Sequence, residues 1–171
     1  MKQNAKQAQD ESCGAVCFLA GSDQHESWYI DSGATCHMTG NRKIFILLMD
    51  KKGPNIILAD GKVVESMGCG SGTVIGVNGK GSAVDVNLEN VLYVPSLTSG
   101  LVSVDKLTSK GFTVRFKGDS CEICDATGRV SVVGERSGCL FKLKLAEASK
   151  RLAEVVNTCG TNVSVIGIRQ L

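Results

Sequence analysis

Short apolar runs separated by glycine and other turn-forming residues are the feature that most restricts the fold of this chain. From Trp28 onward, such runs alternate with turns that contain Gly, Asn or Asp. The chain has 20 glycines but only two prolines in 171 residues, whereas average glycine usage is about 7%. Short strands joined by many tight turns explain this excess, so the pattern predicts a small, mostly antiparallel β domain.

The dipeptides that join some of the runs are typical of hairpins. Asp60-Gly61 and Asn78-Gly79 each separate two apolar runs, and both suit a two-residue hairpin turn. We therefore expect neighbouring runs to pair as antiparallel strands. The expected strands are residues 28–30, 55–59, 62–67, 73–77, 83–88, 91–94, 112–116, 121–124, 130–133 and 140–145.

A single short helix is expected to interrupt these strands. Leu101, Val104 and Leu107 recur at helical spacing within residues 99–110, and the glycine that follows is a stop signal. A weaker helical pattern covers residues 146–156.

The chain divides into three parts by composition. Residues 1–25 are polar and aperiodic, which predicts a linker; residues 26–145 carry the strands, and residues 146–171 form a tail with a possible short helix. The N-terminus lacks the apolar stretch of a signal peptide, and no run approaches the roughly 18 apolar residues of a membrane span. We therefore expect an intracellular, cytoplasmic protein without a membrane partner, whose eight cysteines are free thiols.

The charge pattern argues against direct nucleic-acid binding. The net charge is +2, and the sequence pI is 8.1. Basic and acidic residues are interspersed, whereas a nucleic-acid-binding domain usually has a basic stripe and a pI above about 9.

The motif that carries chemistry lies at residues 28–34, WYIDSGA. An apolar strand delivers Asp31 to a turn of small residues, which is the arrangement that an aspartic protease needs. Its carboxylate must project from a rigid strand end, and small neighbours let backbone amides approach the oxygens. An Asp-Ser/Thr-Gly tripeptide arises by chance in about one chain in ten of this length. An ordinary Asp-Ser-Gly turn after a strand is therefore the alternative.

Further motifs follow in a fixed order. They occupy residues 28–40, 58–62, 90–95, 101–107 and 136–140. Over residues 28 to about 145 the chain resembles the protease segment of copia-type (Ty1/copia) retrotransposon Pol polyproteins, which is also described as a retrovirus-related Pol polyprotein β-barrel domain. One departure is Gly100, where the copia pattern often has Asn. The resemblance implies a mostly β fold, a small closed antiparallel β-barrel of retroviral aspartic-protease type with one short helix.

The resemblance also implies roles for the turn after the first strand. Asp31 is the catalytic aspartate, and Ser32 and Gly33 form the hydrogen-bonded support beneath it. Aspartic proteases use two facing carboxylates that share one proton, and this chain contains one Asp-Ser/Thr-Gly. The second carboxylate is therefore expected from another copy in a C2 homodimer, with no cofactor and no metal.

The flap is assigned by the same comparison. The hairpin that turns at Ala59, Asp60 and Gly61 lies 28 to 30 residues after Asp31. In this class of enzyme, a hairpin 25 to 45 residues after the catalytic strand closes over an extended peptide substrate, and a glycine-bearing turn can lift. A plain surface hairpin is the alternative.

Two cysteine patterns suggest other chemistry. Cys36 and His37 follow Asp31 closely and invite a Cys-His nucleophile hypothesis, but adjacent strand residues point apart. His37 is therefore expected to be a structural or surface residue. Cys121 and Cys124 have the spacing of half a zinc site without a second half, so a buried or half-buried thiol pair is expected.

Two functions follow from the sequence. The first is an aspartic endopeptidase that cleaves the polyprotein of a copia-like retrotransposon, in the cytoplasm and within virus-like particles. The second is a catalytically silent β-barrel with a structural or interaction role, because a chain can keep Asp31 and still fail to dimerise or to form a cleft.

Overall fold

The structure is a computed structural model that describes residues 27–58 and 61–146. The expected linker, the helical pattern in the tail, and the flap residues Ala59 and Asp60 lie outside the described residues. The described part is mostly β with one short α-helix, which confirms the predicted class.

The strands are short except for a long central pair. They are β1 Trp28–Asp31, β2 Met38–Thr39, β3 Phe45–Met49, β4 Asn55–Ile57, β5 Val63–Glu65, β6 Gly68–Val77, β7 Ala83–Tyr93, β8 Gly100–Ser103, β9 Thr113–Lys117, β10 Ser120–Cys124, β11 Val130–Ser137 and β12 Leu140–Leu143. The helices are the 3-10 helix η1 Arg42–Ile44 and the α-helix α1 Val104–Ser109.

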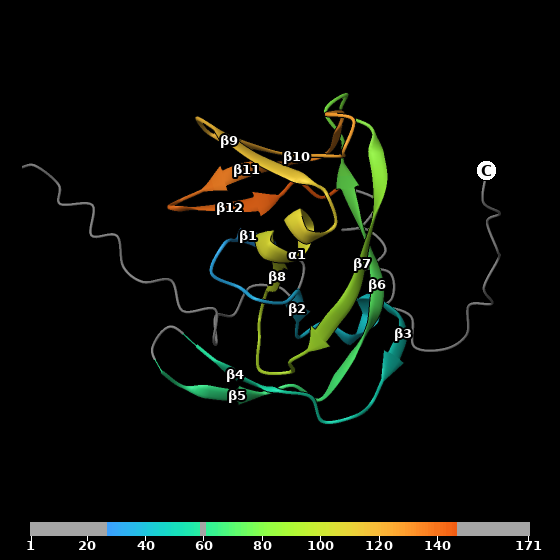
Figure 1. The fold of residues 1–171 in the computed structure, drawn as a ribbon, viewed down its shortest axis with the longest axis vertical. Helices are drawn as coiled ribbons and strands as arrows, with labels where there is room; N and C mark the ends of the chain where they lie inside the picture. The colour runs from blue at the N-terminus through green and yellow to red at the C-terminus, as the bar shows by residue number, and fades with distance from the viewer. Residues whose placement is uncertain (1–26, 59–60, 147–171) are drawn as a thin grey trace, which may run out of the picture.

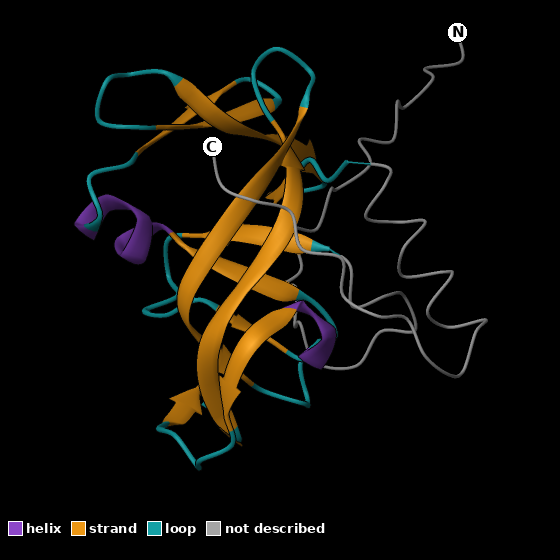
Figure 2. Cartoon of the chain, turned by 90° about the vertical axis from the view of Figure 1, so that its right-hand side faces the viewer, coloured by secondary structure: helices purple, strands orange, loops and turns teal. Residues whose placement is uncertain are grey.

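Ten strands form one strongly curled sheet in the order β3-β6-β7-β2-β8-β1-β12-β11-β10-β9, and β4 and β5 form a separate hairpin (Figure 1). The long β6–β7 pair runs diagonally across the molecule (Figure 2). After β12 the chain reaches back to β6, where Leu145 bridges Gly76. In the described part of the chain, no hydrogen bonds join the edge strands β3 and β9, so the prediction of a closed barrel is not confirmed.

Strand β1, which ends at Asp31, is paired on both sides. It runs parallel to β8, with Asp31 opposite Ser103, and antiparallel to β12. Its residues alternate between two hydrophobic clusters: Trp28 and Ile30 belong to the larger, and Tyr29 packs against the smaller. A strand held at both edges and packed on both faces is a rigid base for the residue at its end.

The larger cluster depends on a close approach between Trp28 and Gly100. Trp28 is only 1% exposed, and a Cβ atom on Gly100 would lie 2.3 Å from its indole ring. Here the absence of a side chain lets β8 pair with β1 in register.

Three differences from the sequence-based expectation follow from strand pairing and burial in the fold. The predicted helix begins later, at Val104, because all four residues of Gly100–Ser103 are buried as strand β8 beside β1. Residues 83–88 and 91–94 are not two strands, since β7 continues through Asn90, whose φ is 54°. Strand β3 was not predicted: its apolar residues do not alternate in burial, and Ile46, Leu47 and Met49 are exposed.

Replacing Gly100 by alanine is expected to destabilise the domain by roughly 3 kcal/mol, the upper part of the usual range for overpacking a core. The new methyl group would displace a buried indole ring. Urea unfolding of Gly100→Ala against the wild type measures the loss. The control Thr113→Ala, at an exposed position of β9, should change the free energy of unfolding by less than about 0.5 kcal/mol. Equal stability of Gly100→Ala and wild type would contradict this account of the β1–β8 contact.

Candidate functional site

Asp31 stands at the end of β1 with its carboxylate partly open to solvent. The backbone N–H of Gly33 donates a hydrogen bond to Asp31 Oδ1 at 2.8 Å. Among the described residues this is the one hydrogen bond that the Asp31 carboxylate accepts, and Ser32 and Gly33 are exposed beside it. The three turn residues therefore lie at one accessible position, with the Gly33 N–H bonded to the carboxylate.

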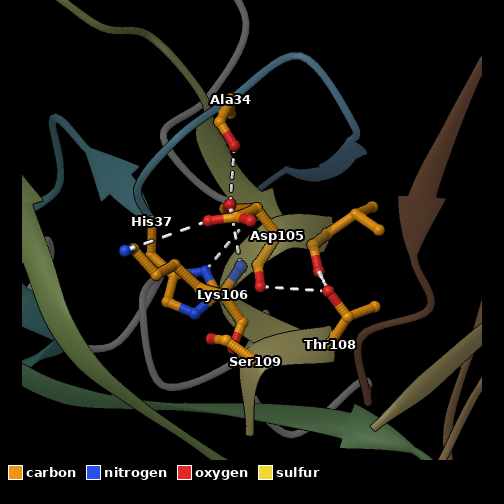
Figure 3. A network of polar contacts seen from close by, with 8 residues as sticks. Ala34, His37, Asp105, Lys106, Thr108 and Ser109 are labelled. Atoms are coloured by element: carbon orange, nitrogen blue, oxygen red, sulfur yellow. Dashed lines mark hydrogen bonds and ion pairs between the residues drawn. The ribbon is translucent and has the colours of Figure 1, made fainter. Parts of the chain in front are cut away.

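Ser103 ties the chain after Asp31 to the start of α1. This fully buried residue donates from Oγ to the carbonyl oxygen of Ala34 at 2.6 Å. The same oxygen accepts the N–H of Lys106 at 3.2 Å and so caps the helix. The Ser103 N–H donates to Nδ1 of His37 at 3.0 Å. Figure 3 shows Ala34 and His37 gathered against the first turn of α1 by these contacts.

Ser103 lies in the motif at residues 101–107, for which the sequence predicted no role of this serine. A serine at the start of a helical pattern is an N-cap signal, because its hydroxyl can accept the N–H of the residue three positions later. This signal would have indicated the bond between Ser103 and Lys106. Its bonds to Ala34 and His37 span 69 and 66 residues of sequence, and no local pattern predicts them.

The β4–β5 hairpin presents one face to the cluster beside Asp31. Ile56 and Val64 are paired across the hairpin and pack against the smaller cluster, which contains Ala34 and the partly buried Tyr29. On the opposite face, Ile57 and Val63 are 75% and 58% exposed. The hairpin is thus anchored through its inner face on the cluster that contains Ala34, three residues after Asp31.

The hairpin turn has the expected glycine. Gly61 has a φ of +80°, and its N–H donates to the carbonyl oxygen of Leu58 at 2.9 Å. The N–H of Leu58 donates to the carbonyl oxygen of Lys62 at 2.8 Å. Ala59 and Asp60, the other two predicted flap residues, lie outside the described residues.

Comparison with known proteins assigns this arrangement to a family. The family described as "Pol polyprotein, beta-barrel domain" matches residues 28–112, which include β1 with Asp31, the hairpin and α1. Residues 28–112 belong to the Pol polyprotein β-barrel domain family.

One curated relative supports the assignment. The chain is 30% identical over 125 residues to the retrovirus-related Pol polyprotein from transposon RE1 of Arabidopsis thaliana. The match covers 71% of this chain and 8% of that polyprotein. No solved structure matches the chain significantly. The predicted resemblance to a copia-type Pol polyprotein is thereby confirmed.

His37 is a structural residue of the β-barrel domain and not a surface residue. Its side chain is 2% exposed, and Nδ1 accepts the Ser103 N–H. Burial lowers the pKa of His37 from 6.5 to about 4, helped by the positive charges of Lys110 and Lys106. At neutral pH the ring is therefore uncharged and carries its proton on Nε2. No hydrogen bond joins His37 to the half-buried Cys36 among the described residues, so the Cys-His nucleophile hypothesis gains no support.

The two cysteines of the half zinc motif are both buried thiols, as predicted. Cys121 belongs to the larger hydrophobic cluster, whereas Sγ of Cys124 accepts a hydrogen bond from Arg115 Nη2 at 2.9 Å. Burial is the main reason that the pKa of Cys121 rises to about 11, so this thiol stays protonated. Within residues 27–58 and 61–146, no group of three His, Cys, Asp or Glu side chains is placed to hold a metal ion. That same part of the chain has no helix of the length and apolarity needed to cross a membrane.

The buried His37 predicts a component of stability that depends on pH. Between pH 6.5 and about 4 the unfolded chain binds a proton that the folded domain does not. This contribution to the free energy of unfolding is fully present above pH 6.5. It should be lost as the pH falls from 6.5 through about 4, by up to roughly 3 kcal/mol. Urea unfolding across this range measures the slope. The variant His37→Gln keeps an acceptor for the Ser103 N–H without a titrating group, so it should lack this component; identical slopes in both proteins would contradict the assignment.

Proposed function

We propose that this domain is an aspartic endopeptidase of a copia-like retrotransposon polyprotein and that it is active only as a C2 homodimer. The observation that carries the proposal is the placement of Asp31. It lies at the end of a strand paired on both edges, accepts the Gly33 N–H and is partly exposed, three residues before Ala34 of the cluster against which the β4–β5 hairpin packs. These are the features that a positioned, solvent-accessible catalytic carboxylate requires.

The homodimer follows from the number of carboxylates that the reaction needs. Hydrolysis of a peptide bond by this mechanism uses an ionised carboxylate to take a proton from water and a neutral one to donate to the scissile carbonyl oxygen. One aspartate cannot do both in the same step. Among the described residues, no other carboxylate is hydrogen-bonded to Asp31, so we assign the second to Asp31 of another copy at a two-fold axis.

The hairpin gives the proposal a substrate class. An extended peptide can pair with backbone groups of β4 and β5, and the apolar side chains of Ile56 and Val64 face the cluster beside Asp31. The substrate is therefore an extended segment of the polyprotein. Ala59, Asp60 and Gly61 form the tip of this flap, Ser32 supports the dyad from beside Asp31, and no cofactor or metal takes part.

The remaining assignments belong to the same proposal. The protease domain covers residues 26–145 as a small barrel, with residues 1–25 as a linker and 146–171 as a tail. Processing takes place in the cytoplasm and within virus-like particles, and the partners are a second copy and the polyprotein.

Removing the proposed catalytic carboxylate is the direct test. Asp31→Asn should lower cleavage of a precursor that carries this segment by at least roughly 100-fold, because the amide can act neither as base nor as acid. Far-ultraviolet circular dichroism should stay unchanged. The matched control is Asp119→Asn, an exposed carboxylate that pairs with Arg136, and it should leave cleavage unaffected. Complete processing by Asp31→Asn would refute the protease assignment.

Mixing experiments test the shared dyad. Below the dimer dissociation constant, activity should rise with the square of protein concentration. At concentrations well above that constant, a ninefold excess of Asp31→Asn protein should reduce the activity of a fixed amount of wild type to about a tenth, since random pairing leaves that share of wild-type subunits in wild-type dimers. The same excess of Asp119→Asn protein should not inhibit.

Two results would argue against this mechanism. Activity that is linear in concentration and indifferent to Asp31→Asn would exclude the dimeric dyad. Absence of cleavage by the wild type at every concentration would favour the catalytically silent β-barrel.

A further inference from the structure

The described part of the chain contains a cavity of about 220 Å³ between β7 and the β10–β12 strands. Asp31 and the β4–β5 hairpin do not line it, so it is separate from the proposed cleft. Its lining is mostly apolar and buried. The apolar side chains are Val86, Leu88, Val102, Leu107, Phe112, Ile123, Val132 and Leu143.

The cavity exists because the sheet does not close at this point. Strand β7 pairs with β6 along nearly its whole length, but on its other edge β2 pairs only with Leu92 and Tyr93. Among the described residues, no strand pairs with that other edge over residues 83–90. The gap beside this edge is lined across from β7 by Ile123, Val132 and Leu143 of the facing strands.

His37 gives the cavity one buried polar group. The side chain is 2% exposed and lines the cavity, and Nδ1 is used by the Ser103 N–H. Among the described residues, Nε2 has no hydrogen-bond partner. Since burial holds the pKa of His37 near 4, the ring is neutral and Nε2 carries a proton to donate. Since Nε2 can donate, a ligand in the cavity with an acceptor oxygen can take its hydrogen bond.

The charged groups around the cavity lie at its exposed rim. Asp85, Glu89 and Lys110 also line it, and Lys110 Nζ pairs with Glu89 Oε2 at 2.7 Å. Most of the apolar walls are buried, so an ionised ligand would lose its hydration there without gaining an oppositely charged partner from those side chains. An uncharged ligand is therefore favoured.

We propose that this cavity binds a small, uncharged, largely apolar molecule whose hydroxyl or carbonyl oxygen accepts a hydrogen bond from His37 Nε2. The size supports one substituted six-membered ring, since an apolar cavity of about 150 Å³ is enough to hold benzene. The mixture of apolar walls and one convergent donor is typical of small-molecule sites. The proposal does not depend on protease activity.

Binding is tested on the full chain with benzyl alcohol as the probe and benzoate as its anionic counterpart. Nuclear magnetic resonance should show saturable shifts of the His37 ring and of the cavity-lining residues with benzyl alcohol. Benzoate should bind at least about tenfold more weakly, because its charge would lose its hydration among the apolar walls.

Two substitutions on β7 form a matched pair. Val86 is half-buried and lines the cavity, whereas the half-buried Val84 does not line it. Val86→Phe fills the cavity and should weaken benzyl alcohol binding at least about tenfold, and Val84→Phe should leave it within about twofold of wild type. If Val86→Phe does not fold, Val86→Leu decides, since it fills less of the cavity and should still weaken binding at least about threefold.

Three results would overturn the proposal. The first is the absence of a saturable shift at the cavity residues with benzyl alcohol. The second is benzoate binding as tightly as the alcohol. The third is unchanged affinity in folded Val86→Phe, or in Val86→Leu where that variant decides.

Discussion

The hydrogen bonds of Ser103 are the constraint on which the site depends. This one buried residue ends β8, caps α1, holds the Ala34 carbonyl and donates to His37. It therefore joins the turn after Asp31, the strand beside β1 and the helix that follows. A buried hydroxyl and N–H with all their hydrogen bonds made add only modestly to the stability of the fold. Loss of one partner, however, leaves a buried polar group unpaired, which is destabilising. The position of Asp31 is thus coupled to the packing of α1.

The strands were largely predictable from the sequence, and the exceptions share one physical cause. Alternation and hairpin dipeptides located β4 and β5, because a half-buried strand repeats every two residues. That rule fails where burial does not alternate. Gly100–Ser103 is buried at every position and resembles a buried helix segment, and Phe45–Met49 exposes most of its apolar residues. Partners distant in sequence decide both cases.

The candidate site was predictable where chemistry is local. An aspartate that follows an apolar strand and precedes Ser and Gly is predicted to lie at a strand end in a turn of small residues. The N–H that bonds its carboxylate belongs to Gly33, two residues away in the sequence. The roles of Ser103 and His37 depend on contacts across more than 60 residues, so composition and spacing could not provide them. The burial of His37 had the same origin, since its neighbours come from α1 and from β2–β8 pairing.

The exposed edge strand β3 bears on the solubility of this domain. Ile46, Leu47 and Met49 are 79%, 62% and 63% exposed, and β6 is the one strand paired with β3 in the described part of the chain. Such an edge is a template for stacking with other molecules. Charged residues flank it, however: Arg42 pairs with Asp50 and Lys52 with Glu65, and Lys43 and Lys51 add one further positive charge on each side. Strands stacked in register would bring these like charges together, so the flanks act as gatekeepers against fibrous assembly.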